Sequence, residues 1–274
     1  MPELPEAETI ARDLRRRVAG AIVRSVTVAR PDVLARGLSP HRLARTLRGR
    51  RILDVTRRAK AVVLEFDGGW RLVIGLGMTG RVVASDAPAA RSLRHVAARV
   101  HLQDGRALLY DDARRFGRLD LRDADAWVQR SSATGVEPLS DEFTAARFHA
   151  LTRASTSPIR NFLLDQKRVA GVGNIYANEA LFRARVRPSR RARTLRRVET
   201  EALQRAIRDV LNEAVDARGT TLNDYRDADG EPGAFQFALQ VYDRAGLPCV
   251  NCATPIKRIV LSNRSAFYCP SCQR

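Results

Sequence analysis

The last 26 residues of the chain contain all four of its cysteines, with a spacing typical of a metal site. Cys249 and Cys252 form one pair, Cys269 and Cys272 form a second pair, and 16 residues separate the pairs. Two such pairs predict a tetrahedral zinc site of four thiolates. Because four cysteines close the site, one structural zinc ion is expected, and not a catalytic one. The alternative is two disulfides.

The second group that could do chemistry is the start of the chain, MPELPEAETI. Removal of Met1 would make the nitrogen of Pro2 a secondary amine, which can attack a sugar C1′ and form an electron-withdrawing iminium ion. The neighbouring carboxyl of Glu3 could move protons in such a reaction. Without further support, an ordinary helix start explains these residues better.

The elements that must position these groups follow from the sequence pattern. Residues 5–19 predict a helix, since apolar residues share one face and Gly20 follows as a stop. This helix would hold the chain start in a fixed place. Residues 21–125 predict a β-sandwich or barrel. The expected strands are 22–28, 61–66, 71–75, 98–103 and 107–110.

The rest of the chain changes to helical patterns after a linker at residues 131–140. We expect a loop at 217–237 and a metal-bound hairpin within 247–274. The expected helices are 141–152, 158–166, 174–185 and 194–216. The fold class is therefore α+β.

The formal net charge of +18 and the pI near 11.1 predict a polyanionic partner, most often nucleic acid. A structural RNA-binding protein would have a similar charge. No run of apolar residues reaches the roughly 18–20 needed to span a bilayer. The acidic start does not resemble a secretory signal, so the expected location is the cytoplasm.

Three separated blocks together resemble one enzyme family. They are PELPEAET at 2–9, LLDQKRVAGVGNIYANEALFRARVRP at 163–188, and NRSAFYCPSCQ at 263–273. The chain resembles formamidopyrimidine-DNA glycosylases essentially from end to end. These enzymes share a fold with the endonuclease VIII enzymes, but Leu4 favours the formamidopyrimidine branch.

The resemblance implies an N-terminal β-sandwich with its first helix alongside, a helix–two-turns–helix motif and a β-hairpin zinc finger. It implies three domains: a catalytic domain at 1–130, a helical DNA-binding domain at 131–240, and the finger at 241–274. The segment 218–235 matches the family's lesion-capping loop and is called the capping loop below. The implied activity is removal of oxidised purines, such as 8-oxoguanine and formamidopyrimidines, followed by β,δ-elimination. The implied partner of this monomer is double-stranded DNA that contains oxidised bases or abasic sites.

The resemblance also implies roles for individual residues. The catalytic set is Pro2, Glu3, Lys60 and Arg264. The DNA-binding set is Met78, His95, Arg114, Phe116, Asn174 and Tyr242. The lesion-binding candidates are Glu6, Thr220, Thr221 and Tyr225.

Several of these residues have simpler local explanations. Lys60 could be a solvated lysine at a strand edge, Asn174 a helix N-cap, and Arg264 a surface charge. Considered locally, Met78 is better explained as a core residue and Arg114 as a surface charge. Glu6 is undecided between helix capping and the pocket.

The chain also departs from the family pattern. Gly75 stands where a histidine is usual, Asn263 replaces a glycine, and only His95 remains of a histidine-rich stretch. These departures concern the grip on DNA more than the nucleophile. Two other functions compete with purine repair. One is the same chemistry on oxidised pyrimidines, and the other is a zinc-finger DNA-binding protein without catalysis.

Overall fold

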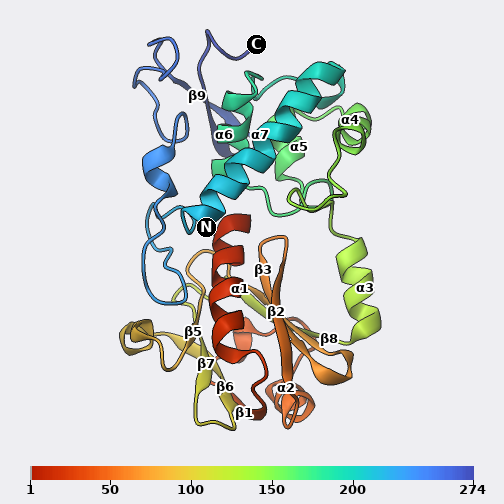
Figure 1. Cartoon of the computed structure of the whole chain (residues 1–274), viewed down its shortest axis with the longest axis vertical. Coiled ribbons are helices and arrows are strands. Elements are labelled where there is room, and N and C mark those ends of the chain that lie inside the picture. The colour runs from red at the N-terminus through yellow and green to blue at the C-terminus, as the bar shows by residue number, and fades with distance from the viewer. Residues whose placement is uncertain (1) are drawn as a thin grey trace. The chain divides into compact units, whose positions relative to one another are not determined.

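The structure is a computed structural model that describes residues 2–274 (Figure 1). Met1, whose removal the proposed chemistry requires, lies outside the described residues. The chain forms two compact units, residues 1–132 with 217–234, and residues 133–216 with 235–274. Most of the capping loop therefore belongs with the first unit, although the sequence-based division placed it with the helical domain. The expected boundaries at 130 and 240 stay a prediction.

The first unit contains two four-stranded antiparallel sheets, with strand orders β1-β6-β7-β5 and β2-β3-β4-β8. Apolar residues of α1 and of both sheets form one core, so the predicted β-sandwich with a flanking helix is confirmed. The helices of this unit are α1 (Leu4–Val18), α2 (Pro40–Leu47) and α3 (Ala124–Ser132). Its strands are β1 (Val23–Val28), β2 (Ile52–Arg58), β3 (Ala61–Phe66), β4 (Arg71–Gly75), β5 (Arg81–Ala84), β6 (Val96–Leu102), β7 (Ala107–Asp111) and β8 (Arg118–Arg122).

The sequence pattern did not predict β2, β5, β8, α2 or α3. In β2 the pairing register shifts between Ile52 and Asp54, which breaks the alternation of apolar and polar residues that marks a strand. β5 has only four residues, too few for a clear period. None of the residues of α3 is buried, so no apolar face distinguishes this helix from a linker.

The second unit is helical and ends in a two-stranded hairpin. Its elements are α4 (Ala145–Arg153), α5 (Ile159–Leu164), α6 (Asn174–Arg183), α7 (Arg197–Asp216), β9 (Lys257–Leu261) and β10 (Arg264–Tyr268). α5, the turns at 165–173 and α6 form the predicted helix–two-turns–helix motif. No helix within residues 2–274 is long and apolar enough to cross a membrane.

The turn between β9 and β10 consists of two residues, because Leu261 pairs directly with Arg264. Ser262 and Asn263 have φ values of 48° and 60°. Two consecutive positive φ angles are typical of the tight turn that matches the twist of a hairpin, and asparagine adopts this conformation readily. Asn263 therefore fits the turn in place of the usual glycine.

A partly buried ion pair in the second unit makes its stability depend on pH. Arg190 donates to both carboxylate oxygens of Glu199, at 2.6 and 3.0 Å, and the N–H of Arg196 donates to the same carboxylate at 2.8 Å. The hydrogen bond from Arg190 is the main cause that lowers the pKa of Glu199 to about 2. A lowered carboxyl pKa adds stability that is complete above the unfolded pKa and is lost as the pH falls toward 2.

We predict that Glu199→Gln lowers the free energy of unfolding at pH 7 by about 1–2 kcal/mol and flattens its decline between about pH 4.5 and 2. The matched control is Glu201→Gln, whose partner Arg197 is exposed, and this change is expected to cost under about 0.5 kcal/mol. Denaturant unfolding at a series of pH values measures both variants. Equal effects of the two variants would contradict the assignment.

Candidate active site

The start of the chain is held at the first turn of α1. Glu3 is the N-cap of this helix, and its N–H donates to Glu6 Oε2 at 2.7 Å. This is one half of a capping box, in which the third helical residue satisfies a free N–H group at the helix start. Pro2, Glu3 and Glu6 are all buried. The structure thus gives the candidate nucleophile and its neighbouring carboxyl a fixed, water-poor position.

Lys60 lies in the two-residue turn that joins β2 and β3, and it is half-buried. The preceding strand is tied to α1, because Arg57 donates to Glu8 Oε2 at 2.9 Å. Arg57 also donates to the carbonyl of Ala59, in the turn itself, at 3.0 Å. These contacts bring the turn to the end of α1 that carries Pro2. The simple picture of a solvated strand-edge lysine does not describe this position.

The capping loop meets α1 at the same end. Glu6 Oε1 accepts a hydrogen bond from the Thr220 N–H at 2.7 Å. The hydroxyl of Thr221 accepts from the Gly233 N–H at 2.9 Å and donates to the Tyr225 carbonyl at 3.0 Å. The Tyr225 hydroxyl donates to the Arg218 carbonyl at 3.1 Å. These side chains shape the loop, and burial, followed by the nearby Glu6 charge, raises the pKa of Tyr225.

Asp112 joins the two loops that carry Met78, Arg114 and Phe116. It accepts from the Thr79 hydroxyl at 2.6 Å and from the Gly117 N–H at 2.8 Å. The Thr79 hydroxyl in turn accepts from the Arg114 N–H at 3.1 Å. The loops approach so closely that a Cβ on Gly77, whose φ is +61°, would lie 2.5 Å from the Gly117 nitrogen.

The side chains presented by these loops are exposed. Phe116 is 57% exposed and Met78 39%, so the local interpretation of Met78 as a core residue is wrong. The guanidinium of Arg114 lies 4.7 Å from the centre of the Phe116 ring. An exposed aromatic ring, an exposed thioether and an arginine are thus gathered in one place.

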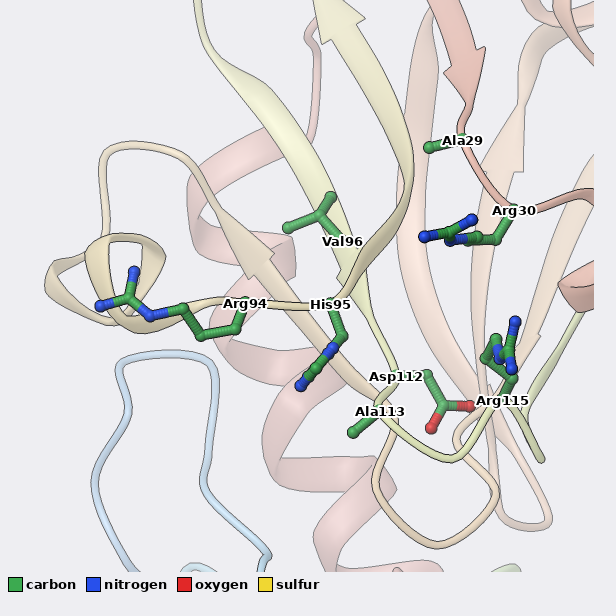
Figure 2. Close-up of a pocket in the computed structure, with 8 residues that line it drawn as sticks. All are labelled: Ala29, Arg30, Arg94, His95, Val96, Asp112, Ala113 and Arg115. Atoms are coloured by element: carbon green, nitrogen blue, oxygen red, sulfur yellow. The ribbon is translucent and has the colours of Figure 1, made fainter.

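His95 lies beside a basic pocket of about 330 Å³ in the first unit, which Figure 2 shows. Arg30, His95 and Arg115 surround it with Asp112, whereas the side chain of Arg94 extends away from the other three. The His95 backbone is fixed, since its N–H donates to Asp111 Oδ1 at 2.5 Å and its carbonyl accepts from the Asp112 N–H at 3.2 Å. Its exposed ring and the two arginines could receive a phosphate.

The second unit has its own basic pocket, of about 420 Å³, which brings together Asn174, Tyr242 and Arg264. Arg258 also lines it and was not predicted. Arg264 is exposed at the turn of the finger hairpin. Three predicted residues from distant parts of the sequence therefore meet in one concave site with two guanidinium groups.

Asn174 is the first residue of α6 and not its N-cap, which is Gly173. Its side-chain oxygen accepts from Arg160 at 2.5 Å, and its side-chain nitrogen donates to the Ser265 carbonyl at 3.1 Å. Arg160 is fully buried and also donates to the carbonyls of Leu261 and Ser265, both at 3.0 Å. Burial, and then the nearby charge of Arg264, lower the pKa of Arg160. This arginine fixes the finger turn against α6.

Two further residues of α6 anchor the neighbouring segments. Asn178 accepts from the Phe267 N–H at 2.7 Å. Glu179 is fully buried and accepts from three successive backbone N–H groups, those of Gln240, Val241 and Tyr242, at 2.8–3.0 Å. Burial raises the pKa of Glu179 and these N–H groups oppose the rise. The anchor fixes the backbone of Tyr242 at the pocket.

The four cysteines form one cluster, in which all sulfur atoms lie within 4.8 Å of one another. They are free thiols, so the disulfide alternative does not hold. Pairs of sulfur atoms are separated by 3.4, 3.5 and 4.0 Å. Tetrahedral zinc with bonds of about 2.3 Å places its sulfur ligands about 3.8 Å apart, so the cluster fits this metal.

Sequence reasoning missed Asp112, Arg160 and Glu179. Each is a charged residue within a segment that the motifs already covered or bordered. Their partners lie far away in the sequence, up to 105 residues for Arg160, so no local spacing reveals them. The available signal was an acidic residue next to a run of apolar residues, as for Glu179, which is followed by Ala180, Leu181 and Phe182 in α6.

Three family models match the chain in order. They describe a formamidopyrimidine-DNA glycosylase N-terminal domain at residues 1–119, the H2TH domain of the same enzymes at 134–226, and a zinc finger found in FPG and IleRS at 246–274. Two curated relatives are formamidopyrimidine-DNA glycosylases. The one from Cereibacter sphaeroides is 43% identical over the whole of both chains. The one from Chloroflexus aggregans is 44% identical over all of this chain and 98% of the relative.

Solved structures agree with this result. The MutM (Fpg) protein of Thermus thermophilus is 43% identical with a TM-score of 0.87, over 99% of this chain and 98% of that one. A mutant of Lactococcus lactis Fpg, in complex with DNA that contains Fapy-dG, is 30% identical with a TM-score of 0.90 over both entire chains. A complex of Lactococcus lactis Fpg with abasic-site DNA is 31% identical with a TM-score of 0.89, over 99% of both chains. The zinc-finger match and the cysteine cluster confirm one structural zinc ion.

We predict that Cys252→Ser abolishes stoichiometric zinc binding and unfolds the finger. Zinc supplies much of the folding free energy of so small a hairpin. The finger core includes Phe182 of α6, so its loss would also expose this ring. Atomic emission measures the zinc content and hydrogen exchange of β9 and β10 measures folding. The control Ser271→Ala lies between two ligands and is expected to keep one zinc; a folded, zinc-free Cys252 variant would contradict the prediction.

Proposed function

The chain belongs to the formamidopyrimidine-DNA glycosylase family, and from this premise we propose that the nitrogen of Pro2 is the nucleophile that releases the damaged base. As a member of this family, the protein is a base-excision repair DNA glycosylase for oxidised purines and also an abasic-site lyase. The observation that carries the assignment of Pro2 is the fixed and buried start of α1, where Glu6 holds the Glu3 N–H.

The reaction follows from the chemistry of a secondary amine. The Pro2 nitrogen bonds to C1′ of the deoxyribose while the bond from C1′ to the base breaks, and the base leaves with a proton. Opening of the sugar ring gives an iminium ion, which makes the C2′ hydrogen acidic. Loss of that proton expels the 3′-phosphate, and a second elimination expels the 5′-phosphate. Hydrolysis of the iminium then frees Pro2.

Glu3 and Lys60 support this sequence of steps. The Glu3 carboxyl follows the nucleophile directly and can pass protons between the sugar oxygen, C2′ and the base. Lys60 lies in the turn tied to the same end of α1 by Arg57, where its charge would hold the phosphate at the lesion. We assign Arg264, at the finger turn, to the phosphate flanking the lesion, together with Asn174 and Tyr242.

Base removal requires extrusion of the nucleotide from the duplex, which leaves a gap in the stack. We assign Phe116 to wedge between base pairs, Arg114 to hydrogen-bond the orphaned partner base, and Met78 to fill the gap. Their exposure and their joint support by Asp112 favour this assignment. The exposed ring of His95, beside Arg30 and Arg115, is assigned to a backbone phosphate.

The lesion-binding candidates act in two ways in this proposal. Backbone N–H groups between Thr220 and Tyr225 face the extruded base, while the side chains of Thr221 and Tyr225 keep the loop in shape. Glu6 holds the loop beside the nucleophile. With its bacterial relatives and the strong positive charge as support, we further infer a cytoplasmic enzyme that acts on the nucleoid.

Oxidised pyrimidines are a second candidate substrate class. A structural relative, Lactococcus lactis Fpg, has been solved with DNA that contains an oxidised pyrimidine, at 31% identity and a TM-score of 0.88. Single-turnover rates on matched duplexes with 8-oxoguanine or an oxidised pyrimidine compare the two classes.

We predict that borohydride traps a covalent complex between the wild-type enzyme and 8-oxoguanine DNA, and that Pro2→Gly reduces trapping roughly hundredfold or more. The matched control is Pro5→Ala, which removes a nearby proline but keeps the terminal nitrogen. Mass spectrometry of the trapped peptide identifies the linked residue. Trapping through any residue other than Pro2, or an active preparation that retains Met1, would refute the proposal.

A further inference from the structure

One face of α1 carries a row of charged side chains that hold the capping loop. Glu6 accepts from the Thr220 N–H at 2.7 Å, Asp13 Oδ2 accepts from Arg218 at 2.6 Å, and Arg17 is paired with Asp229. Helix positions separated by seven and then four residues lie on the same face. The helix that starts at the nucleophile is therefore also the support along which this loop is fixed.

Arg218 is the centre of this arrangement and has an uncommon backbone. Its φ is +59°, a left-handed conformation that costs a residue other than glycine about 1 kcal/mol or more. Its guanidinium donates to Asp227 Oδ2, at 2.8 Å from Nε, and to Asp13 Oδ2. Both carboxylates come from residues that are no more than 2% exposed. Two buried carboxylates that share one guanidinium offset the backbone strain and fix the residue.

Asp227 transmits this fixed position to the rest of the loop. Its second oxygen accepts from the Asp229 and Glu231 N–H groups, both at 2.9 Å, which turns the chain back. The backbone carbonyl of Arg218 accepts a hydrogen bond from the Tyr225 hydroxyl. The segment between Arg218 and Glu231 is therefore constrained at both ends and in the middle.

The capping loop and the start of the chain are also hydrogen-bonded to the same side chain, Glu6. The two oxygens of the Glu6 carboxylate bind the Glu3 N–H and the Thr220 N–H, each at 2.7 Å. A displacement of the loop along α1 would break the second of these hydrogen bonds. The hydrogen bonds of Arg218 with Asp13 and Asp227, called the anchor below, oppose that displacement. Asp13 lies about two turns further along the helix than Glu6.

We propose that Asp13 and Asp227, acting through Arg218, are positioning residues for base recognition: they hold the capping loop in order on α1 before DNA arrives, so that an extruded purine meets a preformed row of N–H groups beside Pro2. The proposal rests on the lesion-reading role given to the loop above. A loop that is ordered in the free enzyme loses no affinity to ordering when the base binds, whereas a loop ordered about one tenth of the time weakens binding about tenfold.

The anchor should matter for only one of the two activities. Release of an oxidised purine needs the base to be held while the Pro2 nitrogen attacks C1′. Strand cleavage at a preformed abasic site has no base to hold, so it does not need the capping loop to bind one. Loss of the anchor therefore separates glycosylase activity from lyase activity, which general destabilisation of α1 would not do.

The test compares Asp13→Asn with the wild-type enzyme on two duplexes that differ only at the lesion, 8-oxoguanine or an abasic site. We expect kcat/KM for 8-oxoguanine release to fall about tenfold or more, and abasic-site cleavage to stay within about twofold. The control is Arg16→Gln, which removes the exposed second partner of Asp13 but leaves Arg218 in place. It is expected to change neither activity.

Asp227→Asn breaks the same anchor from the loop side and leaves α1 intact, so it keeps the test decisive if the Asp13 variant folds poorly. In both variants, hydrogen exchange of the free enzyme should show faster exchange of amides between Thr220 and Glu231. Equal loss of both activities, or unchanged 8-oxoguanine release, in a folded Asp227 variant overturns the proposal. Failure of the wild-type enzyme to form the borohydride-trapped complex would instead refute the proposed function.

Discussion

The first unit depends on the buried carboxylate of Glu6. An ionised carboxylate that is withdrawn from water is costly unless strong donors surround it. Here the donors are two backbone N–H groups, one at Glu3 and one at Thr220, which lie far apart in the sequence. Because both N–H groups donate to the same buried carboxylate, loss of either takes a hydrogen bond from Glu6, so the positions of the chain start and the capping loop are coupled. A helix-capping residue thereby becomes the link between the proposed nucleophile and the loop proposed to read the base.

In the second unit, buried charged side chains likewise fix the backbone through hydrogen bonds. Glu179 binds three successive N–H groups before the finger, and Arg160 binds two carbonyls on either side of the finger turn. Removing either side chain would leave the buried backbone groups that it binds without a partner, at a cost of about 1–3 kcal/mol for each unsatisfied group. The backbone around the pocket is therefore held in place by the buried side chains of Arg160 and Glu179. Arg264 is exposed at this finger turn, so its guanidinium can reach a phosphate.

The sequence predicted the functional groups better than the residues that hold them in place. The cysteine pairs and the helix at 5–19 follow from spacing and periodicity, which are local properties, whereas the roles of Pro2 and Glu3 are implied by the family resemblance. Asp112, Arg160 and Arg218 act through partners that only the folded chain brings near, so no window of sequence reveals them. The strand β2 was missed because a register shift breaks its alternation. Met78 shows the limit of composition, since an apolar residue type predicts burial whereas its loop holds it in solvent.

In the wedge role proposed for Phe116, its exposure in the free protein would act as stored binding free energy. An aromatic side chain that stays largely in water forgoes part of the roughly 1.5–3 kcal/mol that burial would give. The loop cannot fold back to bury the ring, because Asp112 and the close approach of Gly77 to Gly117 fix its backbone. In the proposed complex the ring is buried between base pairs, where that free energy offsets part of the few kcal/mol needed to unstack a base. A flexible loop would lose this gain, because the ring would already pack against the protein in the absence of DNA.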